Sequence, residues 1–190
     1  MAEPINLNYA TPKPFAVVTQ DQFSVFHARG VLNKWKGDRL WRVYVKDGKL
    51  FFIRVGGSKQ QQAALGAQFG LLGMLIGMWL HKRDAKKTEQ KLQEIHSVPP
   101  EQLIAGEKEN LEYEQRQLSE MSIEPSSFWG GAKIGRLVFR DPAGKKRSLM
   151  FEDAASAQSA HAHLSGAMGQ ALKVNATWDD VKAKFIKKAK

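Results

Sequence analysis

An apolar segment from Ala63 to Leu80 places the strongest constraint on what this chain can fold into. It is the longest apolar run in the sequence, and only Gln68 interrupts it. Four glycines recur within it at spacings of four, three and four: Gly66, Gly70, Gly73 and Gly77. At about 100° per residue these glycines share one face of a helix, where another backbone can approach closely. A helix that is apolar on all sides is buried, either in lipid or in protein.

The length and the flanks of this segment favour contact with a membrane. A helix of this length rises about 27 Å, against a hydrocarbon core of about 30 Å. Cations follow the apolar run directly, at Lys82, Arg83, Lys86 and Lys87. Such a cluster binds anionic headgroups and orients its end of the helix towards the cytoplasm. The alternative is a soluble helix buried in its own domain or in an oligomer, with the glycines as packing notches.

Composition indicates a globular protein with an anionic partner. The chain has 190 residues, 43% hydrophobic and 25% charged, which suits one domain with an insertion or two small domains. It has no cysteine, as expected in a reducing compartment. The first fifteen residues have no basic region followed by an apolar one, so we expect no secretory signal. A net charge of +10 favours anionic headgroups or nucleic acid as partners.

A β-hairpin is predicted over residues 40–55. Two runs of β-branched and aromatic residues flank Asp47-Gly48, a dipeptide that tolerates the positive φ of a two-residue turn. The predicted register pairs Lys46 with Lys49. One face then carries Trp41, Val43, Val45, Leu50 and Phe52, and the other carries Arg42, Tyr44, Phe51 and Ile53. Since both faces are largely apolar, we expect the hairpin to be central in its sheet.

An extended arm is predicted for residues 1–14. A helical hairpin is predicted for residues 58–124. Its first helix contains the apolar segment and ends before Pro99-Pro100. A second helix is predicted from Glu101, because apolar residues recur every seven positions at Ile104, Leu111 and Leu118. The glutamates between them are interpreted as its solvated face: Glu107, Glu109, Glu112, Glu114 and Glu120.

Strands resume near Ala132, turn at residues 141–144 and return over residues 145–152. Asp153 is the expected N-cap of a helix whose buried face comprises Ala157, Ala160, Leu164, Met168 and Leu172. A short basic amphipathic helix is predicted for residues 175–190, with acidic residues in its first turn and lysines at its end.

The fold class that follows is α+β: a bent antiparallel sheet closed by a C-terminal helix, with an inserted helical hairpin. In VYVKDGKLFFI (Val43–Ile53) and GRLVFRDPAGKKRSLMFED (Gly135–Asp153), the chain resembles pleckstrin-homology-like (PH/GRAM-type) domains. The resemblance divides the β domain into residues 15–57 and 129–174. It implies a module that binds anionic lipids or proteins and has no chemistry of its own.

We expect no catalytic residues, metal or cofactor. The sequence lacks the nucleophile-elbow and phosphate-loop motifs, and His161 and His163 are two apart, a poor spacing for metal ligands on a helix. The candidate binding groups are cations: the cluster from Lys82 to Lys87, and Lys145, Lys146 and Arg147 at the expected tip of the second strand pair.

Two functions remain open. The first is a cytoplasmic, membrane-associated binding or scaffold protein, whose PH-like module contacts anionic lipid or a protein partner. The glycine-rich helix then inserts into the membrane or self-associates as a homo-oligomer. The alternative is a soluble oligomeric adaptor, whose basic surface binds an acidic protein or nucleic acid, the less favoured of the two partners. Basic residues beside aromatics at residues 34–44 would suit nucleic acid.

Gly73→Leu tests the glycine face. If the glycines form a contact surface, leucine at this mid-helix position holds the neighbouring backbone away, so self-association is lost or the domain unfolds. In a helix that merely faces lipid, the change is tolerated or mildly favourable. Sedimentation and crosslinking of both proteins, with and without detergent, measure this. Unchanged assembly and thermal stability would show that the glycines do not pack.

Overall fold

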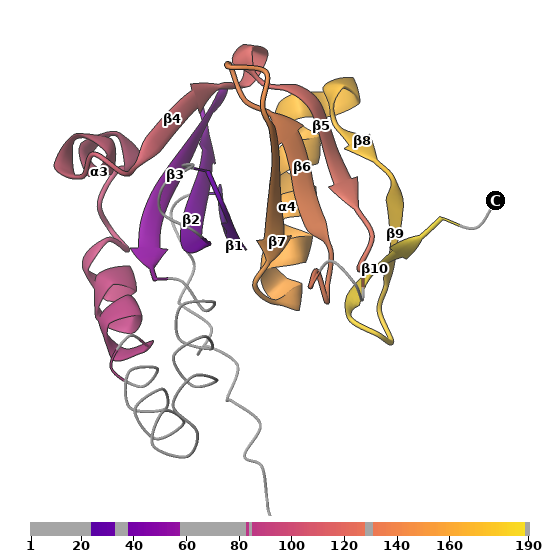
Figure 1. The fold of residues 1–190 in the computed structure, drawn as a ribbon, viewed down its shortest axis with the longest axis horizontal. Coiled ribbons are helices and arrows are strands. Elements are labelled where there is room, and N and C mark those ends of the chain that lie inside the picture. Colours follow the sequence, from indigo (N-terminus) through magenta and orange to yellow (C-terminus); the bar gives the residue numbers. More distant parts are fainter. Residues whose placement is uncertain (1–23, 33–37, 58–82, 84, 128–130, 189–190) are drawn as a thin grey trace, which may run out of the picture.

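The computed structural model describes residues 24–32, 38–57, 83, 85–127 and 131–188 as an α+β fold (Figure 1). The strands are β1 (Ser24–Gly30), β2 (Arg39–Lys46), β3 (Lys49–Gly56), β4 (Leu111–Glu114), β5 (Ser119–Glu124), β6 (Arg136–Arg140), β7 (Lys146–Phe151), β8 (Lys173–Val174), β9 (Ala176–Asp179) and β10 (Lys184–Lys187). The helices are a helical stretch at residues 85–94, α3 (Pro100–Gly106), α4 (Ala154–Met168) and the single 3-10 turns η1 (Gln115–Gln117) and η2 (Gly169–Ala171).

Eight strands form one mixed sheet in the order β4-β3-β2-β1-β7-β6-β5-β8. All neighbours are antiparallel except β5 and β8, which run parallel. The prediction of an antiparallel sheet is therefore wrong for this one pair of strands. The central strand β1 pairs with β2 on one side and with β7 on the other. The two predicted strand pairs therefore belong to one sheet, although a long segment separates them in the sequence.

The β2–β3 hairpin has the predicted register. Lys46 pairs with Lys49, Val45 with Leu50 and Val43 with Phe52. Asp47 and Gly48, at φ 49° and 71°, make the turn that their sequence predicts. Both faces of the hairpin are buried, as its two apolar faces indicate.

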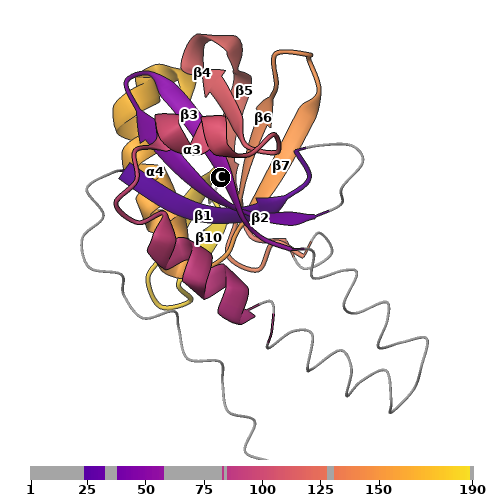
Figure 2. The ribbon, with the colours of Figure 1, turned by 90° about the vertical axis from the view of Figure 1, so that its left-hand side faces the viewer.

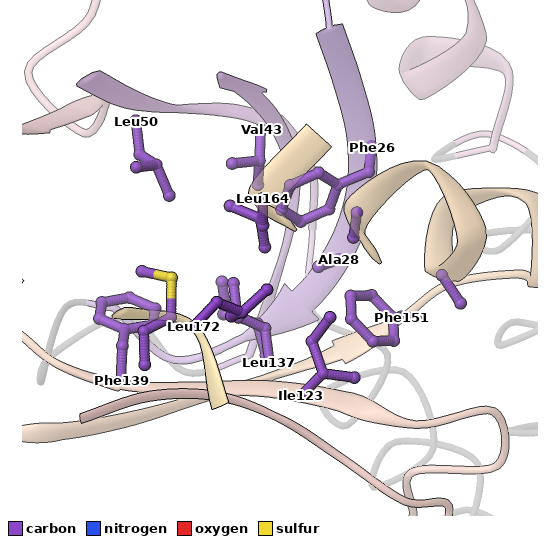
Figure 3. Close-up of a cluster of buried hydrophobic side chains, with 14 of the residues drawn as sticks. Phe26, Ala28, Val43, Leu50, Ile123, Leu137, Phe139, Phe151, Leu164 and Leu172 are labelled. Atoms are coloured by element: carbon purple, nitrogen blue, oxygen red, sulfur yellow. The ribbon is translucent and has the colours of Figure 1, made fainter. Parts of the chain in front are cut away.

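The inner face of the bent sheet holds the main core. Side chains from the two halves of the sheet point towards one another in Figure 3, including Phe26 and Val43 from one half and Leu137 and Phe139 from the other. Helix α4 closes this core with Ala157, Ala160, Leu164 and Met168, followed by Leu172, which is the predicted buried face. The side chain of Asp153 accepts a 2.6 Å hydrogen bond from the Ser156 amide, which confirms the predicted N-cap.

A second apolar cluster lies on the outer face of β1, β2 and β3. Val25, Leu40, Tyr44, Phe51, Ile53 and Val55 are buried there. The chain after the apolar segment covers them with Leu92 and Ile95, then with Leu103 and Ile104 of α3. Figure 2 shows α3 and the helix of residues 85–94 on this side of the strands. The second part of the insertion is thus a layer of the fold.

The predicted second arm of the helical hairpin is wrong. Helix α3 ends at Gly106, and Leu111 and Leu118, the later members of the seven-residue repeat, pack in the inner core. In β4, Leu111 and Tyr113 alternate with Glu112 and Glu114, a period of two that favours a strand. Asn110 stabilises the transition: its side chain donates to Leu103 O at 2.7 Å and accepts from the Arg54 amide at 2.9 Å.

The predicted C-terminal helix is also wrong, because β9 and β10 form a hairpin. The Asp179 side chain accepts a hydrogen bond from the Lys182 amide at 2.9 Å, and Ala183, at φ 47°, turns the chain back into β10 where a helix would continue. Phe185 of β10 is 1% exposed and packs against Phe151 and Trp178, with ring centroids at 6.1 and 5.0 Å. Its amide donates to Ile134 O at 2.7 Å.

A buried arginine joins β1 to the start of the insertion. Arg29 is 9% exposed, its Nη1 donates to Gly57 O at 2.9 Å, and its Nε donates to Glu152 at 3.2 Å. A carboxylate oxygen of Asp38 lies 3.9 Å away. This group of contacts links the ends of β3 and β7 to β1.

The apolar segment at residues 63–80, with its four glycines, lies outside the described residues, as do the N-terminal arm and Lys82. Of the helices that the structure describes, none has both the length and the apolar content needed to cross a bilayer.

Phe185→Ala is expected to lower the free energy of unfolding by about 3–5 kcal/mol, because it leaves a cavity where the C-terminal hairpin meets the core. Val181→Ala in the same hairpin is the control, since Val181 is 95% exposed. Urea denaturation followed by tryptophan fluorescence measures both. Equal stability of the two variants would show that the hairpin is not anchored in the core.

Candidate anionic-surface site

The basic cluster after the apolar segment lies on the surface. Arg83 and the first turn of the helix at residues 85–94 are exposed, including Lys86 and Lys87. Lys86 and Lys87 have no ion-pair partner within the described part of the chain. Their charges are therefore available to a partner.

The three cations predicted at the turn between β6 and β7 differ in their exposure. Lys145 and Lys146 are exposed, whereas the side chain of Arg147 is 13% exposed and its Nη2 lies 2.6 Å from the Asp141 carboxylate. Asp141 also accepts from the Lys145 amide at 2.9 Å. Arg147 thus shapes the turn and is not an available anion-binding group, which corrects its predicted role.

The electrostatics of Asp141 follow from these contacts. Burial of the carboxylate raises its pKa, but hydrogen bonds from the Lys145 amide and from Arg147, with the positive charge of Arg147, outweigh burial and hold the pKa below its usual value. The ionised form of Asp141 therefore stabilises the folded turn.

Carboxylates of the insertion neutralise the cations of the other half of the sheet. Lys46 pairs with Glu101 and Lys49 with Glu112, both at 2.6 Å. Arg54 pairs with Glu109, and Lys91 with Glu107 at 2.5 Å. The prediction that the glutamates cover a solvated helix is wrong, because helix α3 ends at Gly106, and Glu109 and Glu112 pair with cations of β3.

The titration of these surface pairs agrees with their geometry. The hydrogen bond to Glu101 raises the pKa of Lys46, and the hydrogen bond to Glu112 raises the pKa of Lys49. The same contact from Lys46 lowers the pKa of Glu101. Because each of these cations lies against a carboxylate, this half of the surface has little net charge to offer.

Several positively charged side chains lie on the outer face of β5–β8, the side of these strands opposite the core. Strand alternation places Arg136, Val138 and Arg140 of β6 on this face, because Leu137 and Phe139 point into the core. The register then adds Lys146, Ser148 and Met150 of β7, Ser122 and Glu124 of β5, and Lys173 of β8. No described helix lies on this face; α4 lies behind the strands in Figure 1.

Most cations of the outer face of β5–β8 lack an acidic partner. In residues 85–127 and 131–188, no carboxylate lies within ion-pair distance of Arg136, Lys146 or Lys173. Arg140 is the exception, pairing with Glu120 at 2.7 Å. Glu124, the carboxylate on the face itself, accepts hydrogen bonds from Ser122 and Asn175, both at 2.8 Å.

The structure does not bring the two predicted clusters together. The β6–β7 turn lies at the end of the sheet that carries the β2–β3 turn. Tyr113 pairs with Leu50 beside the β2–β3 turn and is also near Asp141 of the β6–β7 turn; burial, and then the charge of Asp141, raise the pKa of Tyr113. The helix of residues 85–94 lies at the opposite end, below β3 in Figure 1. Lys145 and Lys146 are therefore remote from Lys86 and Lys87.

An open groove of about 700 Å³ lies beside the β2–β3 turn, with Met121 and Met168 among its lining residues. Its charged lining is mixed, with Asp47, Lys49, Glu114, Arg116 and Glu120. Among the described residues, no group of three or more His, Cys, Asp or Glu is placed to hold a metal. This mixture of charges selects no ligand class.

No family model matches the chain, and the searches of curated proteins and of solved structures found no similar protein.

The prediction from sequence missed Arg136, Arg140 and Lys173 as candidate binding residues. The signal was present for β6, where arginines alternate with core residues. Nothing local identifies Lys173, because its place on the face depends on the parallel pairing of β8 with β5.

Asp141→Asn tests the role of the β6–β7 turn. It should cost about 1–3 kcal/mol at pH 7, because the variant loses a charged acceptor for Arg147. Since the folded-state pKa of Asp141 is lowered, its stabilisation is complete above the unfolded value of about 3.9 and is lost as pH falls through the folded value. Thermal melts at pH 7 and at decreasing pH should show the wild type and variant converging in acid. A constant difference would contradict this assignment.

Proposed function

We propose that this protein is a non-enzymatic, membrane-associated binding or scaffold protein. Its sheet and α4 form a PH-like module, and its apolar glycine-rich segment inserts into the membrane or self-associates there. The contact with lipid is made first by the cations that follow that segment.

The topology supports the PH-like part of the proposal. From β4 through β1 and β7 to β5 the strands form an antiparallel sheet that wraps around one core. Helix α4 follows β7 and closes that core, in the order of elements that the resemblance implies. The insertion lies between β3 and β4, which are neighbours in the sheet, so it leaves and rejoins the module at one edge.

The observation that carries the membrane part is the exposure of Lys86 and Lys87 directly after the apolar segment. Cations at the end of an apolar helix lie at the level of anionic headgroups, where each contributes about 1 kcal/mol to binding. Farther along the same insertion, Lys91 is paired with Glu107. Lys86 and Lys87, close to the apolar run, are thus left available to a partner.

Lys86→Gln/Lys87→Gln should weaken binding to vesicles of phosphatidylcholine with phosphatidylserine by about 30-fold, since two contributions of about 1 kcal/mol are removed. Wild-type binding should also weaken as salt concentration rises. Vesicle co-sedimentation at several salt concentrations measures both effects.

Lys108→Gln/Arg116→Gln is the matched control, because it removes the same charge from exposed positions elsewhere on the chain. It should bind as the wild type does. Equal wild-type binding to vesicles of phosphatidylcholine alone would contradict the electrostatic contact. Absence of all vesicle binding, with retained binding to an acidic protein or to nucleic acid, would favour the soluble adaptor instead.

A further inference from the structure

The outer face of β5–β8 carries three cations without an acidic partner among the described residues: Arg136, Lys146 and Lys173. Val138 and Ser122 at its centre are each 6% exposed, so its accessible atoms belong mainly to the surrounding long side chains. Lys146, Ser148 and Lys173 are exposed, and Arg136 and Arg140 are partly so. We propose that this face lies against an anionic lipid bilayer, with these cations on headgroup phosphates.

The arrangement of the cations suits an extended flat partner. Arg136 and Arg140 lie four residues apart on β6, or about 13 Å at the rise of a strand. Lys146 is the cross-strand neighbour of Arg140, and Lys173 lies two strands from β6, at about 5 and 10 Å given the usual strand spacing. The charges thus spread over a patch comparable to several lipid headgroups, with no single point of convergence.

The chemistry of this face matches phosphate esters. Arginine donates through a planar fork that fits phosphate oxygens, and lysine supplies a mobile point charge. Ser148 lies opposite Val138, between Lys146 and Met150 on β7, and adds an exposed hydroxyl. Met150 gives the patch a flexible apolar group beside the cations.

A bilayer fits this face better than nucleic acid or an acidic peptide. Among the described residues of this face there is no aromatic side chain on which a base can stack, because the phenylalanines of β6 and β7 point into the core. β5, β6 and β7 each have paired neighbours on both sides, and the edge strand β8 has only two residues, so an extended peptide finds little strand edge to join there.

The lipid partner of this face agrees with the membrane contact proposed above, on which the inference rests. In Figure 2, β6 and β7 lie on the right of the molecule and α4 lies on the left. A bilayer on the right-hand side meets the outer face of β5–β8, and Lys86 and Lys87 supply a separate cationic contact with the same class of lipid. Helix α4 then lies on the side away from the lipid.

Arg136→Gln/Lys146→Gln/Lys173→Gln should weaken binding to phosphatidylserine vesicles by about 100-fold and leave the thermal melt unchanged, because none of the three has an acidic partner in the described part of the chain. Lys108→Gln/Arg116→Gln/Lys182→Gln is the control of equal charge and should bind within a few-fold of the wild type.

Single-cysteine labelling gives a second measurement that does not depend on affinity. The chain has no cysteine, so Ser148→Cys carries one environment-sensitive fluorophore on the face, and Gln158→Cys carries one on the exposed side of α4. Phosphatidylserine vesicles should shift the emission of the first label to the blue and leave the second unchanged. Phosphatidylcholine vesicles should shift neither.

The outcomes separate this inference from the proposed function. Wild-type binding that is lost in Lys86→Gln/Lys87→Gln but kept in the face variant, with no shift of the Ser148→Cys label, would overturn the inference and leave the proposed function standing. Absence of vesicle binding by the wild type would overturn both. Loss of duplex DNA binding in the face variant, without any change in vesicle binding, would assign the face to nucleic acid and also overturn the inference.

Discussion

The pairing of β1 with two different partners holds the whole fold together. Residues 24–30 pair along their length with β2, and the last three pair with β7. Without this strand the sheet separates into two pieces, β4-β3-β2 and β7-β6-β5-β8, and neither encloses the core. Gly30 lies at the joint, where a Cβ atom would come within 2.4 Å of Ser148 O, so this close approach of β1 and β7 requires glycine. Arg29 and Glu152 add a buried ion pair beside it.

Local signals in the sequence were sufficient for the elements whose pattern agrees with their environment. Asp47-Gly48 predicted the turn and the register, and Asp153 predicted the start of α4, because each acts through backbone geometry within a few residues. The two failures share a cause. At residues 101–120 and 175–190, a helical period and helix-like charges coexist with strand alternation, and tertiary contacts decide between them: Leu118 and Phe185 are held by core residues from distant segments.

Prediction of the candidate site from the sequence is limited in the same way, by contacts between distant segments. Exposed lysines after an apolar run are visible in the sequence, and the structure leaves them exposed. Whether a cation is available, however, depends on partners that pairing brings from elsewhere. Arg147 is neutralised by Asp141, and Lys46, Lys49 and Arg54 by glutamates more than fifty residues away. Arg136 and Lys173 become neighbours on one surface only through the order β6-β5-β8.

The insertion between β3 and β4 begins and ends on strands that are hydrogen-bonded neighbours, with Phe52 opposite Leu111. The sheet therefore holds the two ends of this loop together whatever lies between them. The entropic cost of closing a loop grows only slowly, by about 0.6 kcal/mol for each doubling of its length. Residues 92–104 are needed, since their apolar side chains cover the outer face of the hairpin. Because closure costs so little, the sheet tolerates a stretch of widely different lengths before residue 92, and the length of the apolar segment can change under selection for what that segment contacts.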